Sequence, residues 1–366
     1  MSRLRIGVVG GGMIAQVEHL PNLVALGDRF DLVGVADPSA HVRAAIAERH
    51  ATTAVPTLDD LLALELDALL VATPDPLHPG AVIAGLDAGL HVFSEKPLCY
   101  TQSDAEEIIR RRDATGLVVQ VGYMKRFDPN YEAMLAVLPE GGRGLRYISV
   151  DVNDPDSWPF VDHRPLLRPD DVPAGLIEDA RALQRRQAAE ALGMEVDGAE
   201  LRGYVDPLMS GVVHTVNSVH GMLDRMGIEA GPVVGGRIWA GGASASGTVS
   251  LLDGEATWHF AQVFAPGIAW YQERYMLHFD DLAVEIQFPS PYLNHQQTAV
   301  IVRRSTGLRL DTTLVQAGYG EGFVRELEGF HDAITGAAPQ RNTVEEAMRD
   351  AGLLTEVARR AIGVPA

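Results

Sequence analysis

The feature that most constrains the fold is a glycine-rich turn near the start of the chain. A short apolar run, Leu4–Val9, leads directly into residues 10–15 (GGGMIA), and a segment with helical apolar spacing follows. A buried strand that enters a helix through G-x-G-x-x-A is typical of dinucleotide-binding folds. There Gly10 permits the tight turn, Gly12 lets the backbone approach a pyrophosphate, and small Ala15 allows close helix–strand packing. For this motif alone, a plain strand-to-helix turn is the alternative.

The next predicted strand, residues 31–36, strengthens this interpretation because it ends in Asp37. Asp37 follows Ala15 by 22 residues, close to the interval expected for a carboxylate that binds the ribose 2′-hydroxyl. A carboxylate there would also repel a 2′-phosphate, and no Arg or Lys follows before Arg43. The pattern therefore favours NAD over NADP. The alternative to a cofactor role is that residues 37–39 form an ordinary turn.

Predicted strands and helices continue to alternate up to residue 121. The further strands are residues 67–72, 90–93 and 117–121, and the helices are residues 41–50, 57–64, 79–88 and 103–115, the last capped by Ser103. This alternation predicts a doubly wound parallel sheet, whose ligands bind outside the carboxyl ends of its strands. The candidate cofactor-binding residues follow those ends: Gly10, Gly12, Met13, Ile14, Asp37, Thr73, Pro74, His78, Glu95 and Lys96.

The strand at residues 90–93 ends abruptly at Ser94-Glu95-Lys96-Pro97. Pro97 has no N–H and disfavours the α region for Lys96, so the chain is neither strand nor helix there. A lysine held extended at the end of a buried parallel strand points into the crevice at that edge of the sheet. We therefore expect Lys96 to face that crevice rather than to be a solvated surface lysine.

Five stretches together resemble the Gfo/Idh/MocA family: VGGGMIA, VADP, VATPDPLH, AGLHVFSEKPL and GYMKRFDP. The resemblance covers nearly the whole chain, and the E-K-P triplet is its most diagnostic part. It implies an NAD(P)-dependent dehydrogenase of sugars, inositols or related polyols. It also implies that Lys96 lies beside the nicotinamide and the reacting carbon. There an ammonium group can hydrogen-bond the substrate hydroxyl, stabilise a developing alkoxide and join a proton relay.

From residue 145 the pattern changes to strands separated by turns. The candidate strands are residues 145–153, 233–239, 247–252, 255–264, 273–279, 283–288, 299–304 and 308–313. They predict a mostly antiparallel open sheet with helices, and family members commonly use its outer face to form homo-oligomers, here a dimer or tetramer. We place the Rossmann domain at residues 1–123 and an α+β substrate-binding and oligomerisation domain at residues 124–366.

Two further features belong to this second domain. Residues 155–203 form an insertion with a predicted helix at Ala174–Leu192. Residues 322–334 and 343–362 are predicted helices that pack back on the first domain, the second capped by Thr343.

A predicted helix at residues 208–226 carries a polar stripe on an otherwise apolar surface. The stripe consists of Ser210, His214, Asn217 and Gly221. In the resembling family this helix carries the catalytic histidine, commonly with an aspartate four residues earlier. His214 matches the histidine, but Ser210 stands at the aspartate position and cannot hold an imidazolium as a carboxylate does.

The resemblance leaves the partner of His214 open. His214 would act as general base, through Lys96 or through another acid such as Asp154 or Asp206, and Asn217 would bind a substrate hydroxyl. A satisfied buried histidine is the alternative for His214. His220 lies off the stripe and is interpreted as structural, and a His214–His220 metal site is not expected because the rings face different ways.

The segment after residue 121 crosses between the two domains in the resembling family. The resemblance places Tyr123, Lys125 and Arg126 near the cleft, with Tyr123 and Arg126 as substrate-binding candidates. For the two basic residues, pairing with local acids is an equally weighted alternative.

Composition narrows the partners. The chain has 366 residues and a formal net charge of -19, which argues against nucleic acid or an anionic membrane because no excess of basic residues exists to neutralise phosphates. Cys99 is the only cysteine, so an intrachain disulfide and thiolate metal clusters are excluded, and we expect no metal. No apolar run approaches the roughly 20 residues of a membrane helix. The first strand begins at Leu4, leaving no room for a signal peptide, so we expect a cytoplasmic protein.

Three functions remain open from the sequence. The first is a dehydrogenase that moves hydride between NAD and a secondary alcohol of a sugar, glycoside, inositol or related polyol. The second is a hydrolase or lyase that retains NAD and acts through transient oxidation of a sugar. The third is a non-catalytic NAD-binding regulator, suggested by Ser210. Fold alone does not decide among them.

Overall fold

The computed structural model describes residues 3–155 and 157–364 and divides into two compact units. Unit 1 comprises Met1–Tyr123, Asp162–Glu195 and Phe323–Arg349, and unit 2 comprises Met124–Val161, Val196–Gly322 and Asp350–Ala366. The domains expected from the sequence, 1–123 and 124–366, differ from these units at residues 162–195 and 323–349. The reason is that both segments pack with the nucleotide-binding sheet although they follow it in the sequence.

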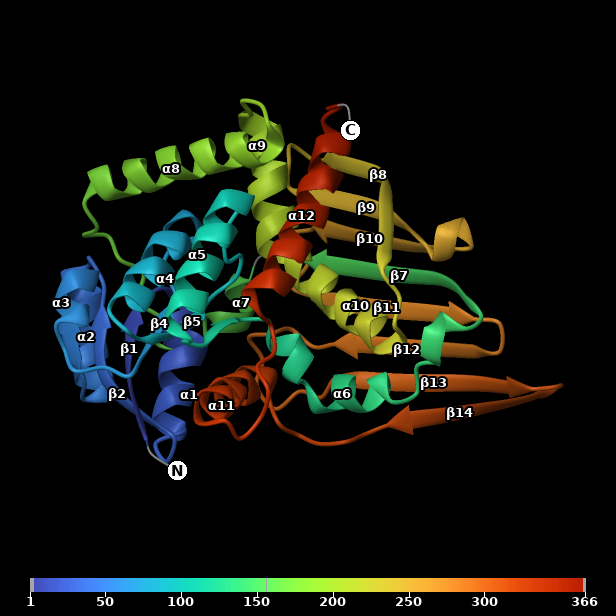
Figure 1. The fold of residues 1–366 in the computed structure, drawn as a ribbon, viewed down its shortest axis with the longest axis horizontal. Coiled ribbons are helices and arrows are strands. Elements are labelled where there is room, and N and C mark those ends of the chain that lie inside the picture. Colours follow the sequence, from blue (N-terminus) through green and yellow to red (C-terminus); the bar gives the residue numbers. More distant parts are fainter. Residues whose placement is uncertain (1–2, 156, 365–366) are drawn as a thin grey trace. The chain divides into compact units, whose positions relative to one another are not determined.

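Unit 1 contains a six-stranded, fully parallel sheet in the order β3-β2-β1-β4-β5-β6. Figure 1 labels β1, β2, β4 and β5 of this sheet. Its strands are β1 (Leu4–Val9), β2 (Phe30–Ala36), β3 (Thr53–Val55), β4 (Ala68–Val71), β5 (His91–Ser94) and β6 (Val119–Val121). The predicted doubly wound sheet is confirmed, and the sequence analysis missed only β3. Its central strands are buried and apolar, as parallel strands covered on both faces require.

Unit 1 also contains helices, most of which connect its strands, while α8 and α11 come from later in the sequence. They are η1 (Ala15–His19), α1 (Leu20–Ala25), α2 (Ala40–His50), α3 (Leu58–Leu62), η2 (Asp75–Leu77), α4 (His78–Asp87), α5 (Gln102–Thr115), α8 (Ala174–Leu192) and α11 (Gly322–Thr335). The α5 helix is capped by Thr101, whose hydroxyl accepts from the Asp104 amide, rather than by Ser103. Leu327 and Phe330 of α11 belong to the hydrophobic core under the sheet.

Unit 2 contains an eight-stranded sheet in the order β14-β13-β12-β11-β7-β10-β9-β8 (Figure 1). The strands are β7 (Leu145–Asp154), β8 (Ala230–Trp239), β9 (Ser244–Leu251), β10 (Ala256–Phe264), β11 (Gln272–Phe279), β12 (Leu282–Phe288), β13 (Ala299–Thr306) and β14 (Arg309–Val315). All neighbours pair antiparallel except β7 and β10, which pair parallel. The predicted, mostly antiparallel sheet is confirmed.

The remaining helical segments are η3 (Met124–Phe127), α6 (Pro129–Leu135), η4 (Glu140–Gly142), α7 (Trp158–Val161), α9 (Gly198–Gly203), η5 (Tyr204–Val212), α10 (Val213–Met226), η6 (Leu252–Gly254) and α12 (Val344–Ala361). The α12 helix continues from unit 1 into unit 2 between residues 349 and 350. Within the described residues, no helix combines the length and apolar character needed to cross a membrane.

The predicted α-helix at residues 208–226 differs from the structure in its first part. Residues Tyr204–Val212 form a π-helix that contains Pro207, and only Val213–Met226 is α-helical. Proline has no N–H to donate to the preceding turn, and a π-helix uses wider i→i+5 hydrogen bonds. The 3.6-residue spacing that placed Ser210 on one stripe with His214 therefore does not hold through Ser210.

Candidate active site

The candidate cofactor residues lie along one edge of the unit 1 sheet, where the parallel strands end. Backbone hydrogen bonds join the turns there: Gly10 N to Ala36 O, Ala72 N to Val9 O and Glu95 N to Val71 O, each 2.8 Å long. The glycine turn, Asp37, Thr73 and Glu95-Lys96 therefore emerge side by side. This is the edge at which open parallel sheets bind their ligands.

The glycine turn has the geometry that a dinucleotide needs. Gly10 has a φ of +98°, and a Cβ atom there would lie 2.3 Å from the carbonyl oxygen of Ala72. A Cβ on Gly12 would meet nothing within 4 Å, so a ligand can approach that backbone. Met13 and Ile14, both half-buried, begin the helix that follows, and Gln16 N donates to Gly12 O.

Asp37 is 9% exposed and is fixed by two backbone amides. Its Oδ2 accepts from Gly11 N and its Oδ1 accepts from Ser39 N, both at 2.8 Å. Because a carboxylate offers about four lone-pair sites, it retains capacity to accept from a ribose hydroxyl. The residue thus stands between the glycine turn and the start of α2.

His78 joins two of the loops at this edge. Its buried ring lies 2.7 Å from Pro97 O through Nδ1 and 2.7 Å from Thr73 O through Nε2. Pro74, next to Thr73, is exposed. The hydroxyl oxygen of Thr73 is buried and has no hydrogen-bond partner within the described residues. A buried polar atom of this kind is expected to meet a ligand or a water.

Glu95 and Lys96 follow β5. The Glu95 carboxylate is buried, with Oε1 2.7 Å from His19 Nε2 and Oε2 accepting from the Lys96 amide at 3.1 Å. Burial raises the pKa of Glu95, but the hydrogen bond and charge of His19, together with Lys96, outweigh it and hold that pKa below its ordinary value. The ionised carboxylate therefore fixes the backbone of Lys96, whose side chain is partly exposed. The sequence analysis missed His19, because only the fold places it against Glu95.

His214 and Ser210 are both half-buried in unit 2, His214 on α10 and Ser210 in the π-helix. The carbonyl oxygen of His214 accepts from the Ser218 hydroxyl at 2.8 Å. Two acids were considered as partners for the His214 ring. Asp206 is exposed, and its Oδ2 lies 3.4 Å from Nε of Arg202. Asp154 Oδ2 accepts a hydrogen bond from Nε2 of Gln262 at 3.0 Å.

Asn217 and His220 share a buried carboxylate. Asn217 Nδ2 donates to Asp350 Oδ2 at 2.8 Å, and His220 Nδ1 lies 2.5 Å from Asp350 Oδ1. All three side chains are buried. The His220 ring also packs edge-on against Trp258 at 5.6 Å, as a structural histidine would. The sequence analysis did not find Asp350, which lies 133 residues after Asn217.

Lys125 pairs with an acid that lies 148 residues further along the chain. Its Nζ lies 2.5 Å from Oε1 of Glu273, and both side chains are buried. The hydroxyls of Tyr271 and Tyr275 also donate to this carboxylate. Arg126 is half-buried beside α10 and donates to the carbonyl oxygen of Asn217 at 3.4 Å.

Tyr123, the remaining substrate-binding candidate, belongs to unit 1. Its side chain is buried, and its carbonyl oxygen accepts from Asn342 Nδ2 at 3.1 Å. The candidates of the sequence analysis therefore fall into two groups. Tyr123 and the cofactor residues belong to unit 1, and Arg126, Ser210, His214 and Asn217 belong to unit 2.

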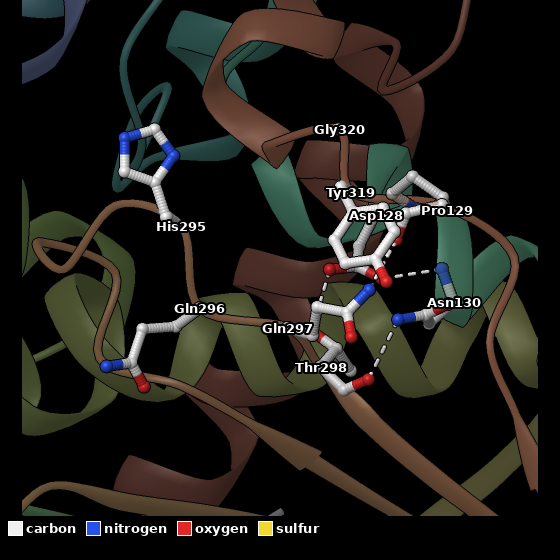
Figure 2. Close-up of a pocket in the computed structure, with 10 residues that line it drawn as sticks. Asp128, Pro129, Asn130, His295, Gln296, Gln297, Thr298, Tyr319 and Gly320 are labelled. Carbon is white, nitrogen blue, oxygen red and sulfur yellow. Dashed lines mark hydrogen bonds between the residues drawn. The ribbon is translucent and has the colours of Figure 1, made fainter.

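Unit 2 also contains a small polar pocket of about 100 Å³ (Figure 2). It lies around Asp128, Asn130, Thr298 and Tyr319, and its described lining includes none of the predicted site residues. Asp128 caps α6 by accepting from the Asn130 and Tyr131 amides, and it accepts from Thr298 Oγ1 as well. Burial raises the pKa of this carboxyl. These bonds explain the polar lining as helix capping and loop closure.

Comparison with known protein families identifies the fold of the first part of the chain. Residues 4–123 match the model of the oxidoreductase family with an NAD-binding Rossmann fold, Gfo/Idh/MocA. Residues 4–123 therefore have the NAD-binding Rossmann fold of the Gfo/Idh/MocA oxidoreductases. The glycine turn, Asp37 and Lys96 all lie within the matched segment, so this segment is the NAD-binding part of the chain.

Relatives agree with this assignment. Inositol 2-dehydrogenase 3 of Saccharopolyspora erythraea is 32% identical over 169 residues, which are 46% of this chain and 50% of that protein. The chain spans half or less of the length of the first curated relatives that it matches.

Solved structures extend the likeness to the whole fold. UDP-N-acetylglucosamine 3-dehydrogenase from Acidithiobacillus ferrooxidans matches with a TM-score of 0.72 at 20% identity, covering 100% of this chain and 99% of that one. The 3-ketoreductase KijD10 from Actinomadura kijaniata, solved with NADP, matches with a TM-score of 0.70 at 20% identity, covering 96% of each chain. At these identities the likeness is one of fold.

The residues present fit a dinucleotide. Three features occur at the same sheet edge: the open space at Gly12, the bend that only glycine tolerates at position 10, and the buried hydroxyl of Thr73, which no group of the described residues bonds. The remaining acceptor capacity of Asp37 suits a ribose hydroxyl.

Proposed function

We propose that this protein is an NAD-dependent dehydrogenase that acts on a secondary alcohol or ketone of a sugar, glycoside, inositol or related polyol. The observation that carries the proposal is the position of Lys96 at the ligand-binding edge of the Rossmann sheet. Its backbone is held by the ionised Glu95 carboxylate, and the next carbonyl is held by His78. The family assignment and the inositol 2-dehydrogenase names of the relatives support the same reaction class.

Each proposed residue has a definite chemical task. Gly10, Gly12, Met13 and Ile14 would hold the pyrophosphate, and Asp37 the ribose; Thr73, Pro74, His78 and Glu95 would shape the nicotinamide end. When bound, the nicotinamide supplies the hydride acceptor or donor. Lys96 would donate a hydrogen bond to the substrate oxygen and stabilise negative charge that develops there. His214 would take the hydroxyl proton as general base.

Tyr123, Arg126, Ser210 and Asn217 are proposed to contact the substrate. For Asn217 the proposal concerns the carbonyl oxygen of its side chain, since its amide nitrogen donates to Asp350. We further propose a cytoplasmic enzyme that forms a homodimer or homotetramer through the unit 2 sheet, as the resemblance implies.

The test is the absorbance of NADH formed at saturating NAD with a panel of polyols, sugars and glycosides. Lys96→Ala and His214→Ala are each expected to lower kcat at least about 100-fold, the scale of lost acid–base catalysis. Both should still bind NAD, measured by calorimetry. Glu48→Ala, at another exposed position of α2, controls for general loss of activity.

The other two functions predict different results. An NAD-retaining hydrolase or lyase would convert a glycoside without net NADH, and product analysis would detect the cleaved sugar. A regulator would bind NAD tightly and turn over no substrate in the panel. Full NADH formation by Lys96→Ala would contradict the proposed catalytic role of Lys96.

A further inference from the structure

Asp171 reaches the cofactor edge of unit 1 from outside the Rossmann repeat. Its Oδ2 accepts from the amides of Ala40 (2.8 Å) and His41 (3.2 Å), the first two residues of α2. Its Oδ1 accepts from the hydroxyl of Ser39, the N-cap residue. These donors belong to the turn that follows Asp37, more than 100 residues earlier in the chain.

The start of α2 lacks an acid of its own. None of the residues in its first turn is acidic, although a helix N-terminus favours negative charge. Asp171 supplies that charge. The hydrogen bond from Ser39, together with those from the His41 and Ala40 amides, lowers the pKa of the Asp171 carboxyl, so it is ionised at neutral pH.

Ser39 joins Asp171 to Asp37. The Ser39 amide donates to Asp37 Oδ1, while its hydroxyl donates to Asp171. Two carboxylates therefore share one residue at the ribose end of the cofactor edge. Arg43, the first Arg or Lys after Asp37, donates to the carbonyl oxygens of Asp37 (2.7 Å) and Pro38 (2.9 Å). The Ser39 hydroxyl and the Ser39, Ala40 and His41 amides therefore already donate to carboxylates of the protein itself.

The segment that carries Asp171 is anchored along the same edge. We call residues 164–171 the strap. Arg164 donates to Val17 O (2.7 Å), and the Leu167 amide donates to Gln16 Oε1 (2.9 Å). Gln16 in turn donates to Gly11 O at 2.7 Å. The strap therefore runs from the helix behind the glycine turn to the first turn of α2.

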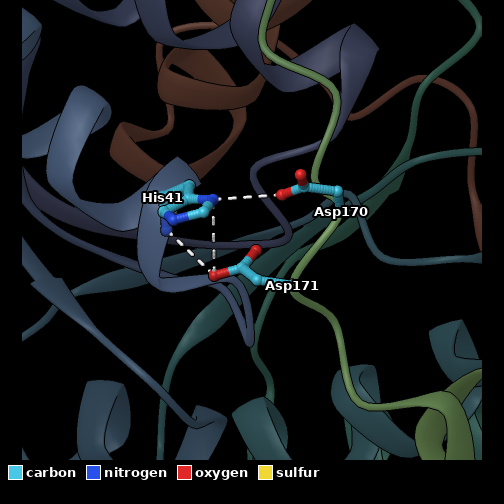
Figure 3. Close-up of side chains that lie close together, drawn as sticks. All are labelled: His41, Asp170 and Asp171. Atoms are coloured by element: carbon cyan, nitrogen blue, oxygen red, sulfur yellow. Dashed lines mark hydrogen bonds and ion pairs between the residues drawn. The ribbon is translucent and has the colours of Figure 1, made fainter.

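Figure 3 shows how the strap meets α2. His41 faces Asp170, at 3.1 Å, and Asp171, at 3.9 Å. Asp170 and His41 are highly exposed, whereas Asp171 is largely covered. Both oxygens of Asp171 already accept hydrogen bonds, which favours a role in holding α2 over a role as a cation ligand.

We propose that Asp171 is a specificity-determining residue that acts with Asp37 to select NAD over NADP. A 2′-phosphate carries up to two negative charges and needs donors beside the ribose. At this turn the phosphate would meet two carboxylates, those of Asp37 and Asp171. Asp171 also occupies the Ser39 hydroxyl and the Ala40 and His41 amides, which would otherwise donate hydrogen bonds to the phosphate. The proposal rests on dinucleotide binding by unit 1 and is independent of the polyol substrate.

The test compares two ligands that differ only in the 2′-phosphate. AMP and adenosine 2′,5′-bisphosphate are titrated by calorimetry, with EDTA present to remove any cation held near His41. NAD and NADP are titrated in the same way. The wild-type protein should bind AMP and NAD more tightly than their 2′-phosphorylated counterparts. In Asp171→Ala the ratio of the two affinities should shift toward the phosphorylated ligand by about tenfold or more, the scale of one or two charge-assisted hydrogen bonds.

Asp170→Ala is the matched control. It removes the same charge from the neighbouring residue but leaves the bonds to Ser39, Ala40 and His41 in place, so its affinity ratio should equal that of the wild type. Asp171→Asn keeps an acceptor of the same size and should give an intermediate ratio. If Asp171→Ala does not fold by circular dichroism, Asp171→Asn decides the question.

Two results would overturn the proposal. One is an equal affinity ratio in Asp171→Ala, Asp171→Asn and Asp170→Ala, even if all affinities fall together, because that would mark Asp171 as structural only. The other is a wild-type protein that binds the 2′-phosphorylated ligands as tightly as AMP and NAD. Because no substrate is added, failure of the polyol dehydrogenase proposal would leave this measurement intact.

Discussion

His220 and Asp350 form a buried pair in unit 2, with Nδ1 of the ring 2.5 Å from Oδ1 of the carboxylate. The same carboxylate accepts from Asn217. Asp350→Ala would leave two buried polar side chains without their acceptor, so the free energy of unfolding should fall by about 3–5 kcal/mol. Urea denaturation measures this, with exposed Glu229→Ala as control. A loss below about 1 kcal/mol, the scale of an exposed pair, would show that the pair contributes little.

Lys125 and Glu273 offer a double-mutant cycle. Lys125→Met leaves the Glu273 carboxylate buried without its cation and should destabilise the protein by about 3–5 kcal/mol. Glu273→Gln removes the charge but keeps an oxygen for the tyrosine hydroxyls. The double variant Lys125→Met/Glu273→Gln should therefore be more stable than Lys125→Met alone. Additive losses in urea denaturation would contradict the pairing.

Glu326 is expected to make stability depend on pH. Burial raises its pKa well above the ordinary value of 4.5, and the charges of Glu95 and Glu18 raise it further. Because the folded state holds this proton more tightly, the stabilising contribution is present below pH 4.5 and is lost as pH rises toward the folded pKa.

The uncharged variant Glu326→Gln isolates this effect. Relative to the variant, the wild-type free energy of unfolding should fall by up to about 1.4 kcal/mol per pH unit above the unfolded pKa. Urea denaturation from about pH 5 to about pH 8 follows the difference. Parallel curves for the two proteins would mean that Glu326 does not hold a proton in the folded state.

His78 should matter for the cofactor through the loops that it joins. His78→Ala removes the ring between Thr73 O and Pro97 O and is expected to weaken NAD binding by about tenfold, the scale of one or two hydrogen bonds. Calorimetry measures the affinity for NAD. As a control, His163→Ala changes an exposed histidine and should bind NAD as tightly as the wild type does. Unchanged NAD affinity in a folded His78→Ala protein would rule this role out.

The chain has two lysines, Lys96 and Lys125, which allows a direct view of the proposed catalytic residue. Reductive methylation with ¹³C-formaldehyde should label Lys96 readily and Lys125 poorly, since Lys125 is buried in its ion pair. In ¹³C NMR spectra the signal of the methylated Lys96 should shift on addition of NAD. The signal is assigned to Lys96 because it is missing from the spectrum of Lys96→Arg. A Lys96 signal that does not shift on addition of NAD would show that the lysine lies away from the cofactor.

Sequence reasoning succeeded where structure depends on local pattern. The strand–glycine–helix unit and the position of Asp37 at the end of β2 follow from periodicity and from the freedom that only glycine has at position 10. The bounds predicted for the helix Ala174–Leu192 match those of α8, because helical periodicity is also a local pattern. The cap of α5 was wrong because Thr101 and Ser103 both offer hydroxyls, and only the extended backbone of Thr101 decides between them.

Sequence reasoning failed where a side chain contacts a partner that is distant in the sequence. The polar stripe of α10 indicated that Asn217 needs a partner, but nothing local identifies Asp350 as that partner. Asp171 likewise looks like an ordinary loop residue until the fold brings it to α2. The π-helix at Tyr204–Val212 also escaped, because a pattern count assumes one helical period throughout.

The α11 helix has a consequence for the order in which the protein can fold during synthesis. Phe330 packs edge-on against Phe93 of β5, 5.7 Å between ring centroids, and Leu327 lies in the same core. The ribosome therefore releases all six strands of the nucleotide-binding sheet long before the residues that cover this part of it exist. Until then the nascent sheet has an apolar face toward water, so chaperones have a defined surface to protect.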